Sequence, residues 1–417
     1  MYTELAPEFI GTLEGETAKA VIAKCVHCGF CNATCPTYQI LGDELDGPRG
    51  RIYLMKEMFE GKPVSPITRE HLDRCLTCRN CETTCPSGVQ YSKLVDVGRR
   101  VIERKAPRPA TERFQRLVLK ELVSRPAVFK AATSVGYSVR GLLPESLKEL
   151  LPKRPEHSRP LPTRSHSRKV WLLDGCVQPS LTPQTNQAAI RVLDALGIGA
   201  EYAAKAGCCG AVTHHLNDLE GAQQQARNNI DAWWPGIADG SVMAIISTAS
   251  GCGVQLEHYA ELLAQDPAYA DKAVKISELA VDISVVIQNE LAERSAESLP
   301  TLSSEVKVAI QEPCTFQHGL KRKGQLGVLL SKFGYTPVPV KDGHLCCGSA
   351  GTYSVLQPEL SHQLRRNKLA DLQVSHPDVI ATANVGCHGH LAAKSPIPVR
   401  HWIELVDDAF AGTEAAA

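Results

Sequence analysis

The sequence lacks several features that would assign a function at once. No apolar run reaches the roughly eighteen residues of a membrane-spanning helix, so we expect none. Its 45 basic and 45 acidic side chains balance, which argues against a dedicated nucleic-acid-binding protein. The first residues have neither the basic start nor the apolar core of a signal peptide, so we expect a cytoplasmic protein. GxGxxG and GxxxxGK[ST] are absent, which leaves a dinucleotide fold and a P-loop unsupported. Hydride or carbanion chemistry is therefore expected on a separate polypeptide.

Cysteine, by contrast, is abundant, with 16 residues. In a reducing cytoplasm such a number indicates metal or redox chemistry rather than disulfide bonds. A chain of 417 residues is also too long for one typical core. We expect a mixed fold, in which a mainly helical, dicluster ferredoxin-like N-terminal domain precedes two tandem α/β repeats with parallel-type sheets. The expected regions are residues 1–105, a basic connector at 106–168, and the repeats at 169–300 and 301–417.

The N-terminal cysteines form two copies of one motif. The stretches CVHCGFCNATCP and CLTCRNCETTCP both match C-x2-C-x2-C-x3-C-P, a pattern typical of paired [4Fe–4S] clusters in which the fourth cysteine ligates the other cluster. The alternative is two structural zinc sites, which would not require eight thiolates in this doubled register. The predicted ligands are Cys25, Cys28, Cys31 and Cys85 for the first cluster, and Cys75, Cys78, Cys81 and Cys35 for the second.

Three arginines lie near these motifs in the sequence. Arg49, Arg51 and Arg79 could raise the reduction potential of a cluster through their positive charge. The interpretation favoured by the sequence is that they form surface ion pairs.

The C-terminal part repeats itself. Apolar runs such as VWLL, VMAIIS, VKVAI and DVIATA predict buried parallel strands, each followed by a helix. A lone cysteine precedes a cysteine pair by 32 residues in both halves, from Cys176 to Cys208 and from Cys314 to Cys346. The closing segments ISELAVDISVVI and VRHWIELVDDAF also agree. Two copies of one α/β unit, related by a pseudo-twofold, explain this similarity.

Each repeat offers four cysteines at expected strand ends, where ligand sites gather. Three hypotheses stay open: a further iron–sulfur centre, zinc or another structural metal, and free or redox-active thiols. Nearby histidines are candidate ligands or proton carriers, although an ordinary polar role is favoured for any one of them. The cysteines are Cys176, Cys208, Cys209 and Cys252, then Cys314, Cys346, Cys347 and Cys387; the histidines are His214, His215, His318, His388 and His390.

The connector is strongly basic, because residues 99–169 carry 18 Lys and Arg but 6 Asp and Glu. Within it, ERFQRLVLKELV predicts an amphipathic helix with Phe114, Leu117, Val118 and Leu122 on one side. One hypothesis is a solvated connector that packs on its own domain. The other is a docking surface for acidic lipid headgroups or a partner subunit.

Taken together, these motifs resemble the iron–sulfur subunits of bacterial glycolate oxidase, a glycolate dehydrogenase. The similarity covers essentially the whole chain and is carried by the cysteine motifs with DGPRGRIYLMK and NNIDAWWP. It implies a complex with two flavoprotein-like subunits, whose FAD oxidises glycolate and D-lactate to the 2-oxo acid. Electrons would then leave through this chain towards membrane quinone, with the complex peripheral on the inner face of the inner membrane. Subunits of glycerol-3-phosphate and lactate dehydrogenase complexes share these motifs and are the alternative.

The paired cysteines also resemble those of heterodisulfide reductases, where they carry unusual iron–sulfur clusters. In that family the last cysteine belongs to a C-x-x-C, whereas Gln255 and His390 occupy the matching positions here. The missing thiols argue against thiol–disulfide chemistry.

Overall fold

The computed structural model describes residues 1–144, 148–149, 151, 159–295 and 299–414. Part of the basic connector, residues 152–158, lies outside this set. The chain divides into two compact units. One, here called the helical unit, comprises residues 1–118 and 344–368, and the other, the sheet unit, comprises residues 119–343 and 369–417.

The helical unit consists of short helices whose starts are encoded locally. Proline occupies the first turn of α3, α4 and α5, where its missing N–H is not needed. The side chains of Thr12 and Ser65 accept hydrogen bonds from backbone N–H groups that begin α1 and α5. The elements are α1 (Leu13–Ala23), α2 (Phe30–Ala33), α3 (Pro36–Leu41), η1 (Glu44–Asp46), α4 (Pro48–Phe59), α5 (Pro66–Asp73), α6 (Asn80–Thr84), α7 (Tyr91–Lys105) and α20 (Tyr353–Leu356).

The core of the helical unit is small and includes cysteines. Met55, Met58 and Phe59 on α4 are completely buried and pack with residues of α1 and α7. A Cβ atom at Gly98 on α7 would collide with the sulfur of Met55, so this glycine allows the two helices to approach. Five cysteines of the two motifs belong to this core or pack against it, which places the candidate ligands away from bulk water.

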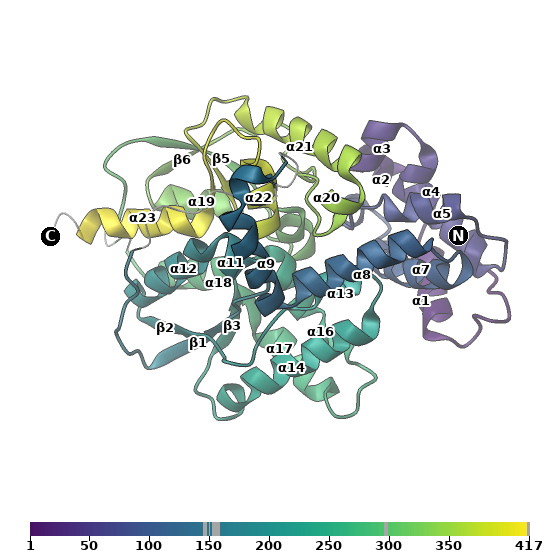
Figure 1. Ribbon diagram of the computed structural model, residues 1–417, viewed down its shortest axis with the longest axis horizontal. Coiled ribbons are helices and arrows are strands. Elements are labelled where there is room, and N and C mark those ends of the chain that lie inside the picture. The colour runs from purple at the N-terminus through teal and green to yellow at the C-terminus, as the bar shows by residue number, and fades with distance from the viewer. Residues whose placement is uncertain (145–147, 150, 152–158, 296–298, 415–417) are drawn as a thin grey trace. The chain divides into compact units, whose positions relative to one another are not determined.

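The sheet unit contains two four-stranded sheets with the same topology (Figure 1). The strand orders are β2-β1-β3-β4 and β6-β5-β7-β8, and every pairing is parallel. The predicted tandem α/β repeats with parallel sheets are therefore confirmed. The strands are β1 (Arg168–Leu172), β2 (Ile198–Glu201), β3 (Ala244–Ser247), β4 (Ala280–Asp282), β5 (Val306–Gln311), β6 (Tyr335–Val338), β7 (Val379–Thr382) and β8 (Val399–His401).

Helices connect these strands as parallel pairing requires. In the first repeat they are α11 (Gln178–Leu181), α12 (Pro183–Ala195), α13 (Ala211–His215), α14 (Leu219–Ala238), α15 (Ser250–Glu257), α16 (Tyr259–Leu262), α17 (Ala270–Leu279) and α18 (Ile283–Ala292). In the second they are η4 (Thr315–Gly319), α19 (Gln325–Lys332), α21 (Pro358–Gln373, whose last residues alone belong to the sheet unit), α22 (Val385–Ala392) and α23 (Trp402–Glu414).

The two sheets share one hydrophobic core. Val170 and Ile246 of the first sheet belong to the same buried cluster as Val308 and Ala381 of the second. Polar contacts cross as well, since a ring nitrogen of His401 lies 2.8 Å from the carbonyl oxygen of Thr248. Burial lowers the pKa of His401 to about 3, so this ring is neutral in the folded protein.

Two helices of the connector stand apart from these cores. In α8 (Ala110–Ser124) and α9 (Pro126–Ser138) the described residues are almost all exposed or half-buried. The predicted amphipathic helix exists, but Phe114 is 67% exposed and Leu117 50% exposed. The apolar side of this helix is therefore mostly exposed, while Arg116 on α8 pairs with Asp73 of the helical unit. Among the residues described, no helix has the length and hydropathy that crossing a bilayer requires.

Candidate metal centres

The first candidate centre is a small cavity in the helical unit. Cys25, Cys28 and Cys31 of the first motif line it together with Cys85 of the second, and Cys81 lines both this cavity and the next one. Two residues of the first loop have positive φ, His27 at 60° and Gly29 at 86°, which coil the chain between successive cysteines.

The second candidate centre has the same construction. Cys75, Cys78 and Cys81 line a separate cavity together with Cys35 of the first motif. Thr77 and Arg79 have φ values of 53° and 60° at the positions that match His27 and Gly29. Because residues other than glycine rarely adopt this conformation, the repeated geometry indicates loops shaped around a common object.

A buried hydroxyl group tests whether iron–sulfur clusters fit these cavities. Tyr91, the first residue of α7, lines both of them. Its hydroxyl is buried and has no hydrogen-bond partner among the described residues, although buried polar groups are nearly always paired. A cluster or thiolate sulfur in either cavity would accept this hydrogen bond.

The thiols themselves also require a cation. Burial, followed by the charge of neighbouring cysteines such as Cys25, raises the pKa of Cys31 to about 11. Burial likewise raises the pKa of Cys81 well above its usual value. These thiols would be protonated at neutral pH without a positive centre, and iron supplies the charge that stabilises thiolates.

The spacing of the sulfur atoms argues against mononuclear zinc. In a zinc–thiolate tetrahedron the sulfurs are about 3.8 Å apart, given Zn–S bonds of about 2.3 Å. Across the described residues, Asp43, Asp46 and His71 form the single group of three ligating side chains whose atoms all lie within 4.8 Å of one another. Neither motif set meets this criterion, so neither has the compact arrangement of a mononuclear zinc site.

Two arginines near the cavities differ in how deeply they are buried, and the expectation of surface ion pairs holds for one of them. Arg49 pairs with Glu44 and keeps a side chain that is 32% exposed, which agrees with a surface ion pair. The expectation was wrong for Arg51, whose side chain is 1% exposed. It lines the second cavity, and its Nη1 lies 3.9 Å from the sulfur of Cys35. The phase of α4 explains the burial, because Arg51, Met55 and Met58 share one helix face.

The first α/β repeat brings its four cysteines together within the sheet unit. Cys176 follows β1, Cys208 and Cys209 precede α13, and Cys252 lies in the first turn of α15. Hydrogen bonds from the thiols of Cys176 and Cys209 hold the pKa of Cys208 well below its usual value, and donating to Cys208 raises the pKa of Cys176. No three of these four sulfurs, all in described residues, meet the 4.8 Å criterion either.

Two residues that the sequence patterns did not single out, Asn229 and Tyr259, hold this cysteine pair. The side chain of Asn229 accepts from the N–H of Gly207 (2.8 Å) and donates to the carbonyl of Cys208 (2.9 Å). The hydroxyl of Tyr259 donates to the carbonyl of Cys209 at 2.9 Å. Asn229 lies in the segment NNIDAWWP and Tyr259 in HYAEL, and both side chains are buried. A hydrogen-bonding side chain beside apolar residues in each of these segments was the signal that the sequence offered.

In the second repeat the cysteines are divided between the two units. Cys346 and Cys347 belong to the helical unit, whereas Cys314 and Cys387 belong to the sheet unit. Gly348 has a φ of 92°, as does Gly210 after the first pair, so the two loops turn alike.

Within the helical unit, the loop of the second pair packs beside the second motif. Asn80 donates from Nδ2 to the carbonyl of His344 at 3.2 Å. The hydroxyl of Tyr353 donates to the carbonyl of Arg74 at 3.1 Å. The cysteine pair at 346–347 is thereby tied to the neighbourhood of the second cavity.

The histidines are only partly explained. The rings of His214 and His215 are stacked with centroids 5.8 Å apart. A ring nitrogen of His388 lies 2.8 Å from the carbonyl oxygen of Val399, so this buried ring has a structural role. His318 is buried on η4, and His390 lies on α22. Nothing places them as ligands.

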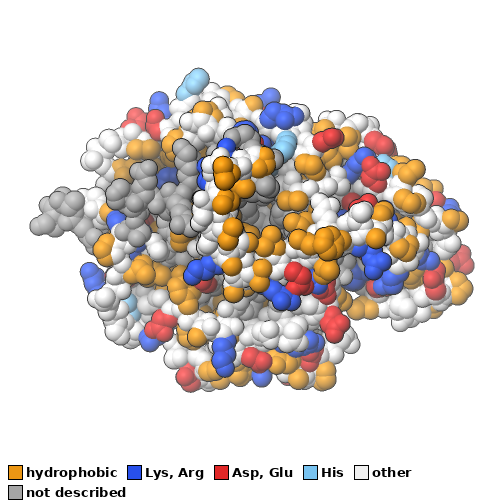
Figure 2. Space-filling model, viewed as in Figure 1, with side chains coloured by type: hydrophobic (Ala, Val, Ile, Leu, Met, Phe, Trp, Pro, Cys, Tyr) orange, Lys and Arg blue, Asp and Glu red, His pale blue; other side chains and the backbone are white. Residues whose placement is uncertain are grey.

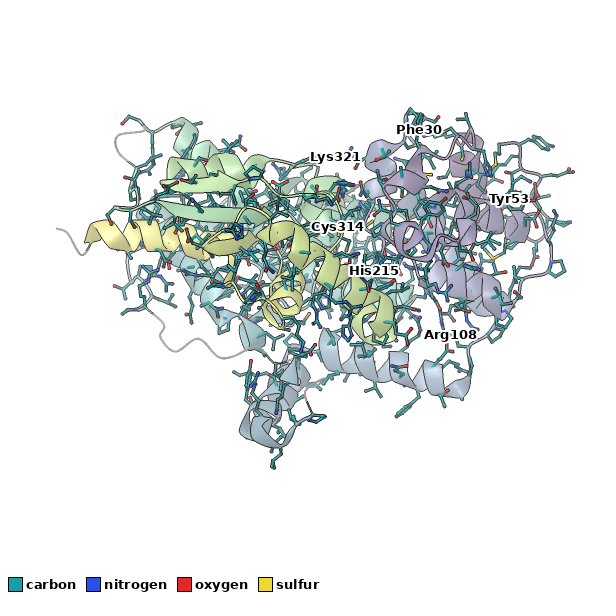
Figure 3. The ribbon with its side chains drawn as sticks, turned by 90° about the horizontal axis from the view of Figure 1, so that it is seen from above. Phe30, Tyr53, Arg108, His215, Cys314 and Lys321 are labelled. Carbon is teal, nitrogen blue, oxygen red and sulfur yellow. The ribbon has the colours of Figure 1, made fainter. Side chains whose placement is uncertain are left out.

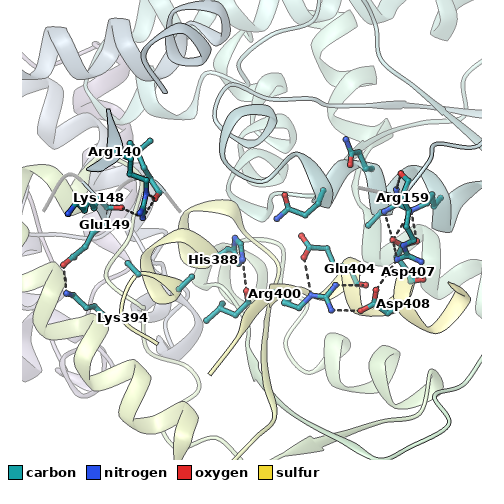
Figure 4. A pocket seen from close by; sticks show the side chains of 18 of the residues that line it. Arg140, Lys148, Glu149, Arg159, His388, Lys394, Arg400, Glu404, Asp407 and Asp408 are labelled. Carbon is teal, nitrogen blue, oxygen red and sulfur yellow. Dashed lines mark hydrogen bonds and ion pairs between the residues drawn. The ribbon is translucent and has the colours of Figure 1, made fainter. Parts of the chain in front are cut away.

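A pocket in the sheet unit contains none of the candidate cysteines (Figure 4). It measures about 1020 Å³ and is rich in charged side chains. Its acidic residues already pair with its cations: Asp407 with Arg159 and Arg191, and Asp408 with Arg400. Six Lys and Arg side chains line the pocket against four Asp and Glu, so its lining stays net basic despite these ion pairs.

Comparison with known proteins identifies both kinds of site. Residues 21–89 match a 4Fe-4S dicluster domain, and residues 170–257 and 308–392 match a cysteine-rich domain. The glycolate oxidase iron-sulfur subunit of Escherichia coli K12 is 51% identical over 409 residues, which are 98% of this chain and 99% of that protein. The chain belongs to the family of glycolate oxidase iron–sulfur subunits. Its cofactors therefore include the two [4Fe–4S] clusters of the dicluster domain.

Other relatives outline this family of glycolate oxidase subunits. A Bacillus subtilis protein named "Probable glycolate oxidase iron-sulfur subunit" is 31% identical over 88% of this chain and 87% of its own length. Lactate utilization protein A of Bacillus licheniformis is 23% identical over 57% of this chain and 99% of its own length. The similarity to the glycolate oxidase subunits thus extends over much more of the chain.

Proposed function

We propose that this chain is the electron-transfer subunit of a flavin-dependent glycolate dehydrogenase complex. FAD on two flavoprotein-like partner subunits would oxidise glycolate, and also D-lactate, to the 2-oxo acid. Electrons would pass through this chain to membrane quinone. The observation that carries this proposal is the pair of cysteine-lined cavities in one small helical unit, combined with the absence of a dinucleotide motif.

The residues have distinct proposed roles. Cys25, Cys28, Cys31 and Cys85 would hold the first cluster, and Cys75, Cys78, Cys81 and Cys35 the second. When bound, the clusters supply single-electron transfer. Tyr91 would donate its hydroxyl hydrogen to a sulfur atom in one of the cavities that it lines, and the packed core around Met55 would exclude water.

Glycolate-dependent reduction tests the proposal. Anaerobic addition of glycolate to the purified complex should produce the electron paramagnetic resonance signal of reduced clusters. The chain purified without partners should give this signal with dithionite but not with glycolate. A glycolate response of the isolated chain would contradict the placement of substrate chemistry on a partner. Turnover of a disulfide by the isolated chain would favour the heterodisulfide alternative.

We also propose that α8 and α9 bind the complex peripherally to the inner face of the inner membrane. Hydrophobic side chains gather where these helices run (Figure 2), and Val128 and Val135 of α9 are exposed along with Phe114 of α8. Exposed cations, among them Arg113 and Lys130, accompany them. Apolar side chains beside basic ones suit the interface of an anionic bilayer.

This membrane proposal predicts salt-sensitive binding. The complex should sediment with vesicles of anionic phosphatidylglycerol and much less with neutral phosphatidylcholine vesicles. Binding should weaken as salt rises, because such attraction is screened within about 8 Å at physiological ionic strength. Leu117→Ser with Val118→Ser should weaken it several-fold, whereas Val274→Ser, at another exposed valine, should not. Equal binding of all variants at every salt concentration would contradict the proposal.

The four cysteines of the first repeat are proposed to hold a further iron–sulfur centre. They are buried or half-buried, share hydrogen bonds and follow the carboxyl ends of parallel strands, where ligand sites gather. All four donors are sulfur, which suits iron–sulfur chemistry. Hydrogen bonds from the side chains of Asn229 and Tyr259 hold the backbone carbonyls of Cys208 and Cys209.

A further inference from the structure

An arginine beside the second cavity is buried, whereas Arg49 beside the first is partly exposed. Arg51 reaches the second cavity from α4 and is almost completely buried. Its Nη1 donates to the hydroxyl of Thr37 at 3.1 Å, and that hydroxyl lies 3.3 Å from the sulfur of Cys35. The guanidinium group is thus adjacent to one predicted ligand both directly and through a hydroxyl.

Its surroundings fix Arg51 in this position. Nε donates to the carbonyl of His71 at 2.6 Å, and Nη2 pairs with the buried carboxylate of Asp46 at 3.3 Å. Arg74 also pairs with Asp46, at 2.9 Å, so two guanidinium groups share one carboxylate. Asp46 therefore offsets only part of the combined charge of Arg51 and Arg74.

The arginine beside the first cavity, Arg49, should affect the reduction potential of its cluster less. Arg49 lines that cavity but is matched by Glu44 and is partly exposed, so water screens its charge. Cys28 is exposed, and so are the apolar side chains of Val26 and Phe30 beside it. Figure 3 shows Phe30 and Tyr53 on the outer side of the helical unit. The arginine of the first cavity is thus partly exposed, whereas Arg51 at the second is buried.

Positive charge close to a cluster favours the reduced state, which carries one more electron. Burial opposes this effect, because a low dielectric disfavours added charge, but it also removes the screening of Arg51. We propose that Arg51 raises the reduction potential of the second cluster, so that single electrons enter at the first cluster, donated by the reduced flavin, and move to the second, from which the quinone withdraws them. This inference rests on the proposed function.

Opposite substitutions test the role of Arg51. Arg51→Gln should lower the midpoint potential of the second cluster, changing its ratio of reduced to oxidised forms at least tenfold at a fixed potential, or about 59 mV. Asp46→Asn removes a negative charge from the same place and should raise that potential. The first cluster should not respond to either change. Arg51→Lys keeps the positive charge, so the midpoint potential of the second cluster should stay close to that of the unaltered chain.

The measurement is a dithionite titration of the isolated, cluster-loaded chain, followed by electron paramagnetic resonance. Variants of Cys28 and Cys78 assign each signal to a cluster. In the unaltered chain the second cluster should be reduced first. The inference would be overturned if both clusters shifted equally, or if the potential of the second cluster did not change. It would also be overturned if Arg51→Gln and Asp46→Asn shifted that potential in the same direction. If Arg51→Gln does not fold, the shift of Asp46→Asn still decides the sign of the effect. Because no glycolate or partner is used, failure here would leave the proposed function untouched.

Discussion

Replacing Cys78 with serine is expected to abolish electron flow from glycolate to quinone in the complex. Cys78 lines the second cavity, and its loss would leave three thiolates there. A poorly held cluster would interrupt electron transfer between the two neighbouring single-electron carriers. The measurement is glycolate-dependent quinone reduction, together with the iron content and resonance spectrum of the purified chain. Unchanged flux with both clusters present would refute the ligand assignment.

A crossed pair of variants makes this test specific. Cys35→Ser lies in the first motif but should perturb the same signal as Cys78→Ser, because Cys35 lines the second cavity. Cys85→Ser lies in the second motif but should perturb the signal affected by Cys28→Ser. If each fourth cysteine instead altered the signal of its own motif, the crossed assignment would be wrong.

The second large effect is expected in the iron content of the sheet unit. Two cubanes account for about eight irons per chain, and a further cubane-sized centre at the first repeat would raise this to about twelve. Cys209→Ser should return the value to about eight, because Cys209 is buried within the four-thiol group. Iron and acid-labile sulfide are measured on anaerobically purified protein.

Matched variants separate loss of metal from loss of folding. Cys252→Ser should reduce iron as Cys209→Ser does, whereas His215→Gln, at an exposed side chain further along α13, should not. Circular dichroism should be the same for all three. About eight irons in the unaltered chain would show that this group holds no cluster.

The sequence predicted those features that depend on spacing along the chain. The crossed ligand sets that the two motifs predict also line the two cavities, with Cys81 lining both, and apolar runs located the central strands β1, β3, β5 and β7. The outer strands were not predicted, because IGAE at β2 and VRH at β8 are too short for a periodic pattern to emerge.

Burial of polar groups was harder to predict. Arginine side chains are usually exposed, so Arg51 was expected at the surface. Only its position on the same face of α4 as Met55 and Met58 indicates that it is buried. Conversely, Phe114 and Leu117 form an apolar stripe that predicts packing, yet they are exposed. Periodicity identifies which residues share a face, but it does not say what covers that face.

The exchange of fourth cysteines between the two cavities has a consequence for assembly. Each cavity requires residues about fifty positions apart, so neither site exists in a nascent chain until both loops have folded around each other. Iron delivered early would meet only three of the four thiols at either place. Assembly of both centres thereby depends on one folding event. A chain in which only one motif has folded has no complete set of four cysteine ligands for a cluster.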